Sequence, residues 1–279
     1  MASSLAHDTT PTPDPDVVGR FHLALSDAWS FLLPSGGVLT TTSLRAIALS
    51  DSARGPAPIS ATTVFCEPVR AGDVVIDVEV LRRGSTTLQA KSSLRQEGRL
   101  GLVTTATFAR DREGPTVSPQ TRPDLPGPDA SRPWVEPTFT SLRSEIPFFT
   151  QVDQRIALGH RWWESTWSAG EARFARWFRY RSSQLVDGFV DPLALPPLAD
   201  TMPPSLRQRL GPGAADVDAP SLDLTIHFLE PTTSEWLLID ARCRVARRGY
   251  ASADVEVWGE DGKLAAFGTQ TMFLRRPKR

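Results

Sequence analysis

Cysteine and histidine are scarce in this sequence, which has two cysteines and four histidines among 279 residues. Cys66 and Cys243 lie in separate halves of the chain, which argues against a disulfide scaffold and favours a reduced, cytoplasmic protein. None of the histidines has the spacing to Cys, Asp or Glu that is typical of metal sites. We therefore expect no metal site.

The sequence also lacks a surplus of positive charge and long apolar runs. Lys and Arg number 31 and Asp and Glu 32, for a net charge of −1, whereas a general nucleic-acid binder needs a basic surplus. No apolar run approaches the ~18–20 residues of a membrane helix, so we expect no membrane insertion. Residues 1–17 lack the apolar core of a secretory signal and are predicted to be a disordered lead-in.

A long internal repeat is present. The stretch that starts at Pro58 recurs from Ala219 with aromatic, turn and charged positions in the same order. The matched pairs are Phe65 with Phe228, Glu67 with Glu230, Asp77 with Asp240, Arg83 with Arg248, and Phe108 with Phe273. A period this long indicates two copies of a domain rather than a solenoid.

The two copies are separated by a proline-rich stretch, with seven prolines from Pro115 to Pro137. Proline removes a backbone donor and disfavours helix before it, which predicts an extended linker. The predicted organisation is a first domain at 18–112, a linker at 113–139 and a second domain at 140–279.

Each copy is predicted to contain one helix followed by four strands. In the first copy the helix starts at Gly36, and strand-like runs follow at 61–67, 73–82, 85–96 and 100–110. In the second copy residues 173–181 alternate like a strand, residues 192–211 predict a short helix limited by prolines, and four strands follow. A helix followed by an antiparallel meander, repeated, is an α+β plan.

The segments SLDLTIHFLEP, EWLLIDA and DGKLAAFGTQ in the second copy, together with this duplicated plan, resemble the type II acyl-CoA thioesterases. The resemblance covers roughly residues 18–110 and 140–276 and implies a double hotdog, in which an antiparallel sheet wraps the helix of each copy. It also implies an enzyme that hydrolyses acyl-CoA without a cofactor, in an active site where an Asp, a Ser or Thr, and a Gln hold a water molecule.

The resemblance places the three catalytic residues in the second copy. They match Asp200 in PLADTMPP, Ser221 at the start of SLDLTIHF and Gln270 in AAFGTQTMF. By the repeat, Gly37 corresponds to Asp200 and Thr105 to Gln270. One site per chain is therefore expected.

Thioester hydrolysis gives these residue types a physical role. Attack on the carbonyl needs a positioned water, a base and a donor for the developing oxyanion. Asp200 can accept the proton of the water, and Ser221 and Gln270 can fix its orientation. Gly36 and Gly37 are candidate substrate-binding residues, because they let the backbone approach a ligand closely.

Two further residues are candidates for substrate binding. Strand alternation puts Ser221, Asp223, Thr225 and His227 on one polar face, which makes Asp223 a neighbour of the site. Trp177, like other tryptophans of the second copy, could line an acyl pocket, with packing between domains or subunits as the alternative.

Other interpretations stay open at this point. Asp200 precedes Thr-Met-Pro-Pro, so capping of a helix is an alternative role. A hotdog hydratase would need a Gly-Asp-x-Asn-Pro-x-His segment, which the sequence does not contain. A non-catalytic protein that binds acyl-CoA or acyl chains is the main alternative function. In every case the open sheet face and edge strands favour a homo-oligomer.

Overall fold

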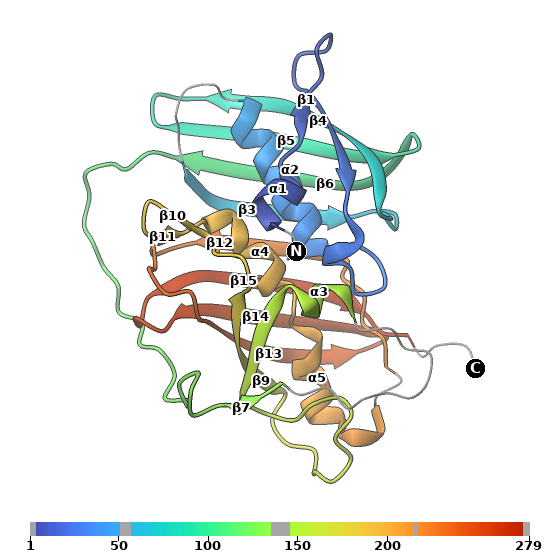
Figure 1. Cartoon of the computed structure of the whole chain (residues 1–279), viewed down its shortest axis with the longest axis vertical. Helices are drawn as coiled ribbons and strands as arrows, with labels where there is room; N and C mark the ends of the chain where they lie inside the picture. The colour runs from blue at the N-terminus through green and yellow to red at the C-terminus, as the bar shows by residue number, and fades with distance from the viewer. Residues whose placement is uncertain (1–3, 51–56, 135–145, 215–216, 276–279) are drawn as a thin grey trace.

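The two copies form one continuous antiparallel sheet in this computed structural model, which describes residues 4–50, 57–134, 146–214 and 217–275. The sheet has thirteen strands in the order β1-β2-β4-β5-β6-β3-β12-β15-β14-β13-β9-β8-β7. Figure 1 shows the first copy, blue to cyan, in the upper half and the second copy, yellow to red, in the lower half. The helices lie on one side of the sheet, as the predicted double-hotdog, α+β architecture requires.

The first copy contains the predicted helix and strands. Its elements are β2 (Arg20–Leu25), α2 (Gly36–Ser50), β3 (Ala57–Phe65), β4 (Gly72–Arg83), β5 (Thr87–Gln96) and β6 (Arg99–Ala109). Helix α2 buries Val38, Leu44 and Ile47 in the main core, in line with their helical spacing. The turn between β5 and β6 places Glu97 and Gly98 at φ +51° and +79°, the left-handed conformation of a tight hairpin.

The second copy repeats this order with an additional strand, β8, and an interrupted helix. Its elements are β8 (Val152–Leu158), β9 (Arg173–Tyr180), α4 (Pro196–Ala199), α5 (Pro203–Leu210), β12 (Asp223–Phe228), β13 (Leu237–Arg247), β14 (Tyr250–Gly259) and β15 (Leu264–Phe273). The single short helix expected within 192–211 is interrupted between α4 and α5. Pro203 and Pro204 have no N–H groups to donate to the carbonyls of Ala199 and Asp200, so the helical hydrogen bonds are interrupted there and α5 begins at Pro203.

The copies join through the central strands β3 and β12. Thr62 pairs with Thr225 in the antiparallel register, and their Oγ1 atoms lie 3.0 Å apart. These threonines are 163 positions apart, so each is the counterpart of the other in the repeat. The pair therefore marks a pseudo-twofold axis, about which the two sheets continue into one another.

The amino-terminal segment is ordered where the structure describes it, so the predicted disordered lead-in is wrong for residues 4–13. Residues Leu5–Thr9 form helix α1, and Thr12–Pro13 form β1 beside β2. Leu5 is fully buried, and the Trp29 indole Nε1 donates to Asp8 at 2.9 Å. One apolar side chain and a few polar contacts hold this segment in place. Because these contacts involve so few residues, the composition of the segment does not reveal that it is ordered.

The linker covers the outer face of the second copy. Strand β7 (Arg132–Pro133) pairs with β8, and the Trp177 Nε1 donates to the carbonyl of Pro126 at 2.8 Å. Leu125 packs against a buried cluster on β9, β13, β14 and β15, which comprises Ala175, Trp177, Leu238, Trp258 and Leu264. Residues 135–139 of the predicted linker lie outside the described residues, and the domain boundaries stay predictions.

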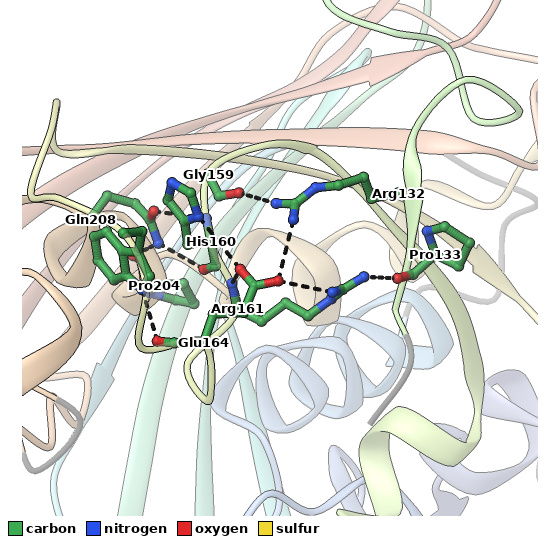
Figure 2. Close-up of polar contacts among 9 residues, drawn as sticks. Arg132, Pro133, Gly159, His160, Arg161, Glu164, Pro204 and Gln208 are labelled. Carbon is green, nitrogen blue, oxygen red and sulfur yellow. Dashed lines mark hydrogen bonds and ion pairs between the residues drawn. The ribbon is translucent and has the colours of Figure 1, made fainter. Parts of the chain in front are cut away.

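The loop after β8 is tied to the linker and to α5 through Glu164 and its neighbours (Figure 2). The carboxylate of Glu164 lies 3.2 Å from Arg132 Nη1 and 2.9 Å from Arg161 Nη1. The side chain of Gln208 on α5 bonds both the N–H and the carbonyl of His160, and the His160 ring stacks on Trp167. Trp167 therefore serves packing.

In the described part of the chain no helix has the length and apolarity to cross a membrane.

The burial of Leu5 leads to a test of the amino-terminal segment. Leu5→Ala should lower the free energy of unfolding by about 2–5 kcal/mol, the usual cost of removing a buried leucine side chain. Leu32→Ala is the matched control, because Leu32 is 90% exposed. Urea denaturation of both variants measures the difference, and equal stability would mean that α1 does not dock.

Candidate active site

Asp200, Ser221 and Gln270 meet at one point, although 70 residues separate the first from the last. Gln270 Nε2 lies 2.6 Å from Asp200 Oδ1 and 2.6 Å from Ser221 Oγ. Ser221 Oγ donates to the same Oδ1 at 3.3 Å. Asp200 follows α4, Ser221 precedes β12 and Gln270 lies within β15, so a helix end and two neighbouring strands hold the cluster.

The second oxygen of Asp200 is bound by the first copy. Oδ2 accepts the Ser35 hydroxyl at 3.0 Å and the Gly37 N–H at 2.9 Å. Both donors belong to the amino end of α2, where free N–H groups and the helix dipole favour a negative charge. Asp200 therefore does cap a helix, but it is α2 of the other copy. Helix α5, which follows Asp200 in the sequence, begins after Met202 without a side-chain cap.

Burial and hydrogen bonding act on the Asp200 carboxyl in opposite directions. The side chain is 8% exposed, and this burial raises its pKa above the ordinary aspartate value. The donors Gly37, Ser35, Gln270 and Ser221 favour the ionised form and oppose the increase. Asp200 thus has a higher proton affinity than an ordinary aspartate, while its hydrogen bonds still stabilise the ionised carboxylate.

Gln270 offers one unused acceptor. The residue is 2% exposed, and both hydrogens of its Nε2 are donated, to Asp200 and to Ser221. Its Oε1 is buried and has no hydrogen-bond partner among the described residues. The reverse amide orientation would put Oε1 against a carboxylate oxygen, so charge fixes the orientation shown. A buried carbonyl oxygen without a partner is the natural acceptor for a water molecule or a ligand group.

A register change brings Ser221 into the site, and it overturns the alternation prediction. Thr225 pairs with Thr269, whereas Ser221 pairs with Met272, which is one residue out of step. Ser221 therefore shares the inner face with Gln270 instead of the outer face with Thr225. Asp223 lies at the irregularity, where its Oδ1 accepts the Thr271 N–H at 2.9 Å. The Asp223 carboxylate therefore takes the place of a backbone carbonyl in the hydrogen bonding between β12 and β15, and it does not bind Asp200, Ser221 or Gln270.

The strand pairing also corrects the repeat correspondences that follow Asp77. Leu88 pairs with Arg83 and Phe108, and Ala251 pairs with Ala246 and Met272, so Arg83 corresponds to Ala246 rather than Arg248, and Phe108 to Met272 rather than Phe273.

Gln270 pairs with Ala253, and Ala106 pairs with Ala90. Ala90 and Ala253 are 163 positions apart, so the counterpart of Gln270 is Ala106, not Thr105. Ala106 is buried on the inner face, whereas Thr105 is exposed. The first copy therefore has Ala106 and Gly37 where the second has Gln270 and Asp200.

The remaining candidates fare differently. The Gly37 N–H is donated to Asp200, so it is already used and does not present a free donor to a ligand. A Cβ on Gly36 would lie 3.2 Å from Asp200 Oδ2, so Gly36 borders the site as expected, while its role toward substrate stays a prediction. Trp177 packs beneath the linker on the outer face, opposite the face that carries Gln270, which contradicts its assignment to the site.

Sequence reasoning missed Ser35. A serine directly before the first helical residue is the usual sequence signal for a helix start, but nothing near it in the sequence indicated a partner 165 residues away.

Over the described ranges, no group of three or more His, Cys, Asp or Glu residues is arranged to hold a metal ion.

Family models match both halves of the chain. Residues 104–274 match the acyl-CoA thioesterase C-terminal domain, and residues 25–109 match the acyl-CoA thioesterase N-terminal domain. The chain belongs to the acyl-CoA thioesterase family. No curated protein matches the sequence of this thioesterase-family chain.

Solved structures share the fold of this thioesterase-family chain. A hot dog fold protein of unknown function from Alicyclobacillus acidocaldarius has a TM-score of 0.82 at 24% identity, with 100% of both chains covered. A putative thioesterase II from Thermobifida fusca has a TM-score of 0.80 at 23% identity, covering 99% of this chain and 98% of the other. An acyl-CoA thioesterase II from Mycobacterium marinum has a TM-score of 0.77 at 21% identity, with 99% of each chain covered. The double-hotdog fold is thereby confirmed.

The close approach of α2 to α4 leads to a second test. A Cβ on Gly37 would lie 2.2 Å from the Pro196 carbonyl oxygen, so Gly37→Ala should force α2 away from Asp200 and cost about 1–3 kcal/mol. Gly114→Ala is the control, because no atom lies within 4 Å of a Cβ there. Chemical denaturation of both variants measures the cost, and an unchanged Gly37→Ala variant would contradict the packing described.

Proposed function

We propose that this protein hydrolyses acyl-CoA thioesters to a free acid and CoA, with Asp200 as the base. The observation that carries the proposal is the convergence of a buried carboxylate, a hydroxyl and an amide on one point in a chain of the acyl-CoA thioesterase family. A thioester carbonyl is reactive enough for a positioned and partly deprotonated water to attack it without a covalent enzyme intermediate.

The water would enter at the weakest point of the cluster. Four donors surround the carboxylate, and the Ser221 hydroxyl makes the longest of these bonds, at 3.3 Å. A water that replaces Ser221 on Oδ1 can donate one hydrogen to Asp200 and the other to the free Oε1 of Gln270, while it accepts the Ser221 hydroxyl. Its remaining lone pair is then directed at the substrate.

The proposed step balances in atoms and protons. The water oxygen bonds to the carbonyl carbon, and Asp200 takes the proton that the water loses. The carbon–sulfur bond breaks, and the proton passes to the departing thiolate. A donor for the developing oxyanion is still needed, and the backbone at Gly36 stays the candidate for it.

Removal of the base or the orienting amide should strongly reduce turnover. Asp200→Asn and Gln270→Ala should each lower kcat at least about a hundredfold, the contribution typical of a positioned general base and its water. Ser221→Thr keeps the hydroxyl and should retain activity. The measurement is release of free thiol from a panel of short-chain to long-chain acyl-CoAs.

Gln89→Ala provides the control for that panel, because Gln89 is an exposed glutamine on a strand of the first copy. Melting temperatures separate loss of activity from loss of fold. A wild-type protein with no turnover above Asp200→Asn on any acyl-CoA would refute the hydrolase.

The raised pKa of Asp200 predicts where activity is lost in acid. The base must be ionised to accept a proton, and burial makes it bind a proton at higher pH than an ordinary aspartate. kcat/KM should therefore fall as the pH falls, with a midpoint above the usual aspartate value of about 3.9. A pH profile measures this limb. Constant kcat/KM down to pH 4 would contradict Asp200 as the base.

A binding protein without catalysis is the second candidate, and one observation favours it. Every hydrogen-bonding position on Asp200 is already filled by protein donors, so water must displace one of them. Acyl-CoA that binds with micromolar affinity but is not hydrolysed would support this function. An acyl-CoA substrate, a cytoplasmic location and a homo-oligomeric state stay predictions.

A further inference from the structure

The single site is built from both copies, and Ser35 is a side chain of the first copy that binds Asp200. This serine belongs to the copy that lacks the catalytic trio, is 2% exposed and donates its hydroxyl to Asp200 Oδ2 at 3.0 Å. Its counterpart in the repeat is Leu198, so no equivalent hydroxyl exists on the other side of the pseudo-twofold axis.

The local geometry of Ser35 is unusual for a residue at the start of a helix. Its carbonyl accepts the Leu39 N–H, which places it at the cap of α2. A capping serine normally uses its hydroxyl to accept a free N–H of its own helix. Here Gly37 gives its N–H to Asp200 instead, and the Ser35 hydroxyl acts as a donor to the same oxygen. Asp200 thus takes over the acceptor role of the cap.

We propose that Ser35 is a positioning residue for the reaction, which anchors Oδ2 of Asp200 so that Oδ1 faces Ser221 and Gln270. The inference rests on the proposed function. A carboxylate held at one oxygen by a hydroxyl and an N–H has little freedom to rotate. Its other oxygen then stays in place when water displaces Ser221.

Among the described residues, the groups that hydrogen-bond to Asp200 are all neutral, so hydrogen bonding sets the effect that loss of Ser35 has on its proton affinity. They are the Gly37 N–H and Ser35 from α2, Ser221 from the segment before β12, and Gln270 from β15. The nearest acidic side chain along β12 is Asp223, which is bound to the Thr271 N–H. Loss of the Ser35 hydroxyl removes a donor that favours the ionised carboxylate, so the proton affinity of Asp200 must rise.

The experiment compares Ser35→Ala, Ser35→Gly and Ser35→Thr with wild type. In the Ala and Gly variants the acid limb of kcat/KM should move to higher pH by about one unit, a roughly tenfold loss of activity on the acid side. Ser35→Thr should restore the limb. Ser35→Gly guards against loss of fold, because glycine at a cap costs only a few tenths of a kcal/mol relative to serine.

Ser131→Ala is the matched control. Ser131 is similarly buried, and its hydroxyl bonds the carbonyls of Pro126 and Gly127 in the linker, away from Asp200. This variant should leave the acid limb in place. An unchanged limb in Ser35→Ala and Ser35→Gly, with only a lower melting temperature, would make Ser35 a helix cap and overturn the proposal.

A second readout separates this inference from the proposed function. The amide chemical shift of Gly37 in an NMR titration reports the ionisation of Asp200 directly, because that N–H is bound to its carboxylate. The midpoint should be higher in Ser35→Ala than in wild type whether or not the protein hydrolyses acyl-CoA. An inactive wild type would defeat the hydrolase alone, whereas equal midpoints would defeat the role of Ser35.

Discussion

The bond between the Asp200 carboxylate and the amino end of α2 is the interaction on which the site depends. A buried carboxylate is costly unless donors surround it, and here a helix start provides two of them, Ser35 and Gly37. That contact crosses from one copy to the other. It therefore links the integrity of the site to the way the two halves are joined, and a separate second copy would leave half of the carboxylate without partners.

The same contact makes the pair of copies asymmetric. Gly37 and Asp200 are counterparts in the repeat and touch each other, as Thr62 and Thr225 do at the centre of the sheet. The threonines can be identical because two hydroxyls can bond one another. At the helix ends one partner must donate and the other accept, so a backbone N–H faces a carboxylate.

Much of this could be predicted from the sequence. The repeat and the α+β plan were readable from aromatic, turn and charged positions, since these recur with the period of a whole domain. Asp200, Ser221 and Gln270 came from the resemblance to a family, and the structure brings them together. Periodicity failed at Ser221, because a one-residue change of register is decided by long-range pairing and by the Asp223 carboxylate, which takes a ladder bond.

Other misses share a cause. The role of Trp177 depended on which face of β9 it occupies, and in a strand buried on both sides alternation carries no information about the face. The docking of Leu5 and the role of Ser35 depend on partners remote in sequence. The local sequence pattern identifies Ser35 as a helix start and Leu5 as an isolated leucine, but it does not identify the residues that pack against them.

The steric limit at Gly37 has a consequence for the symmetry of this chain. A side chain there would collide with the backbone at Pro196 and Pro197, so an aspartate could not occupy the equivalent position in both halves of this arrangement. A pair of identical subunits must carry every substitution twice, whereas two tethered halves can diverge separately. Because the halves belong to one polypeptide, the first can carry Gly37 where the second carries Asp200, and the first half then supports the site of the other.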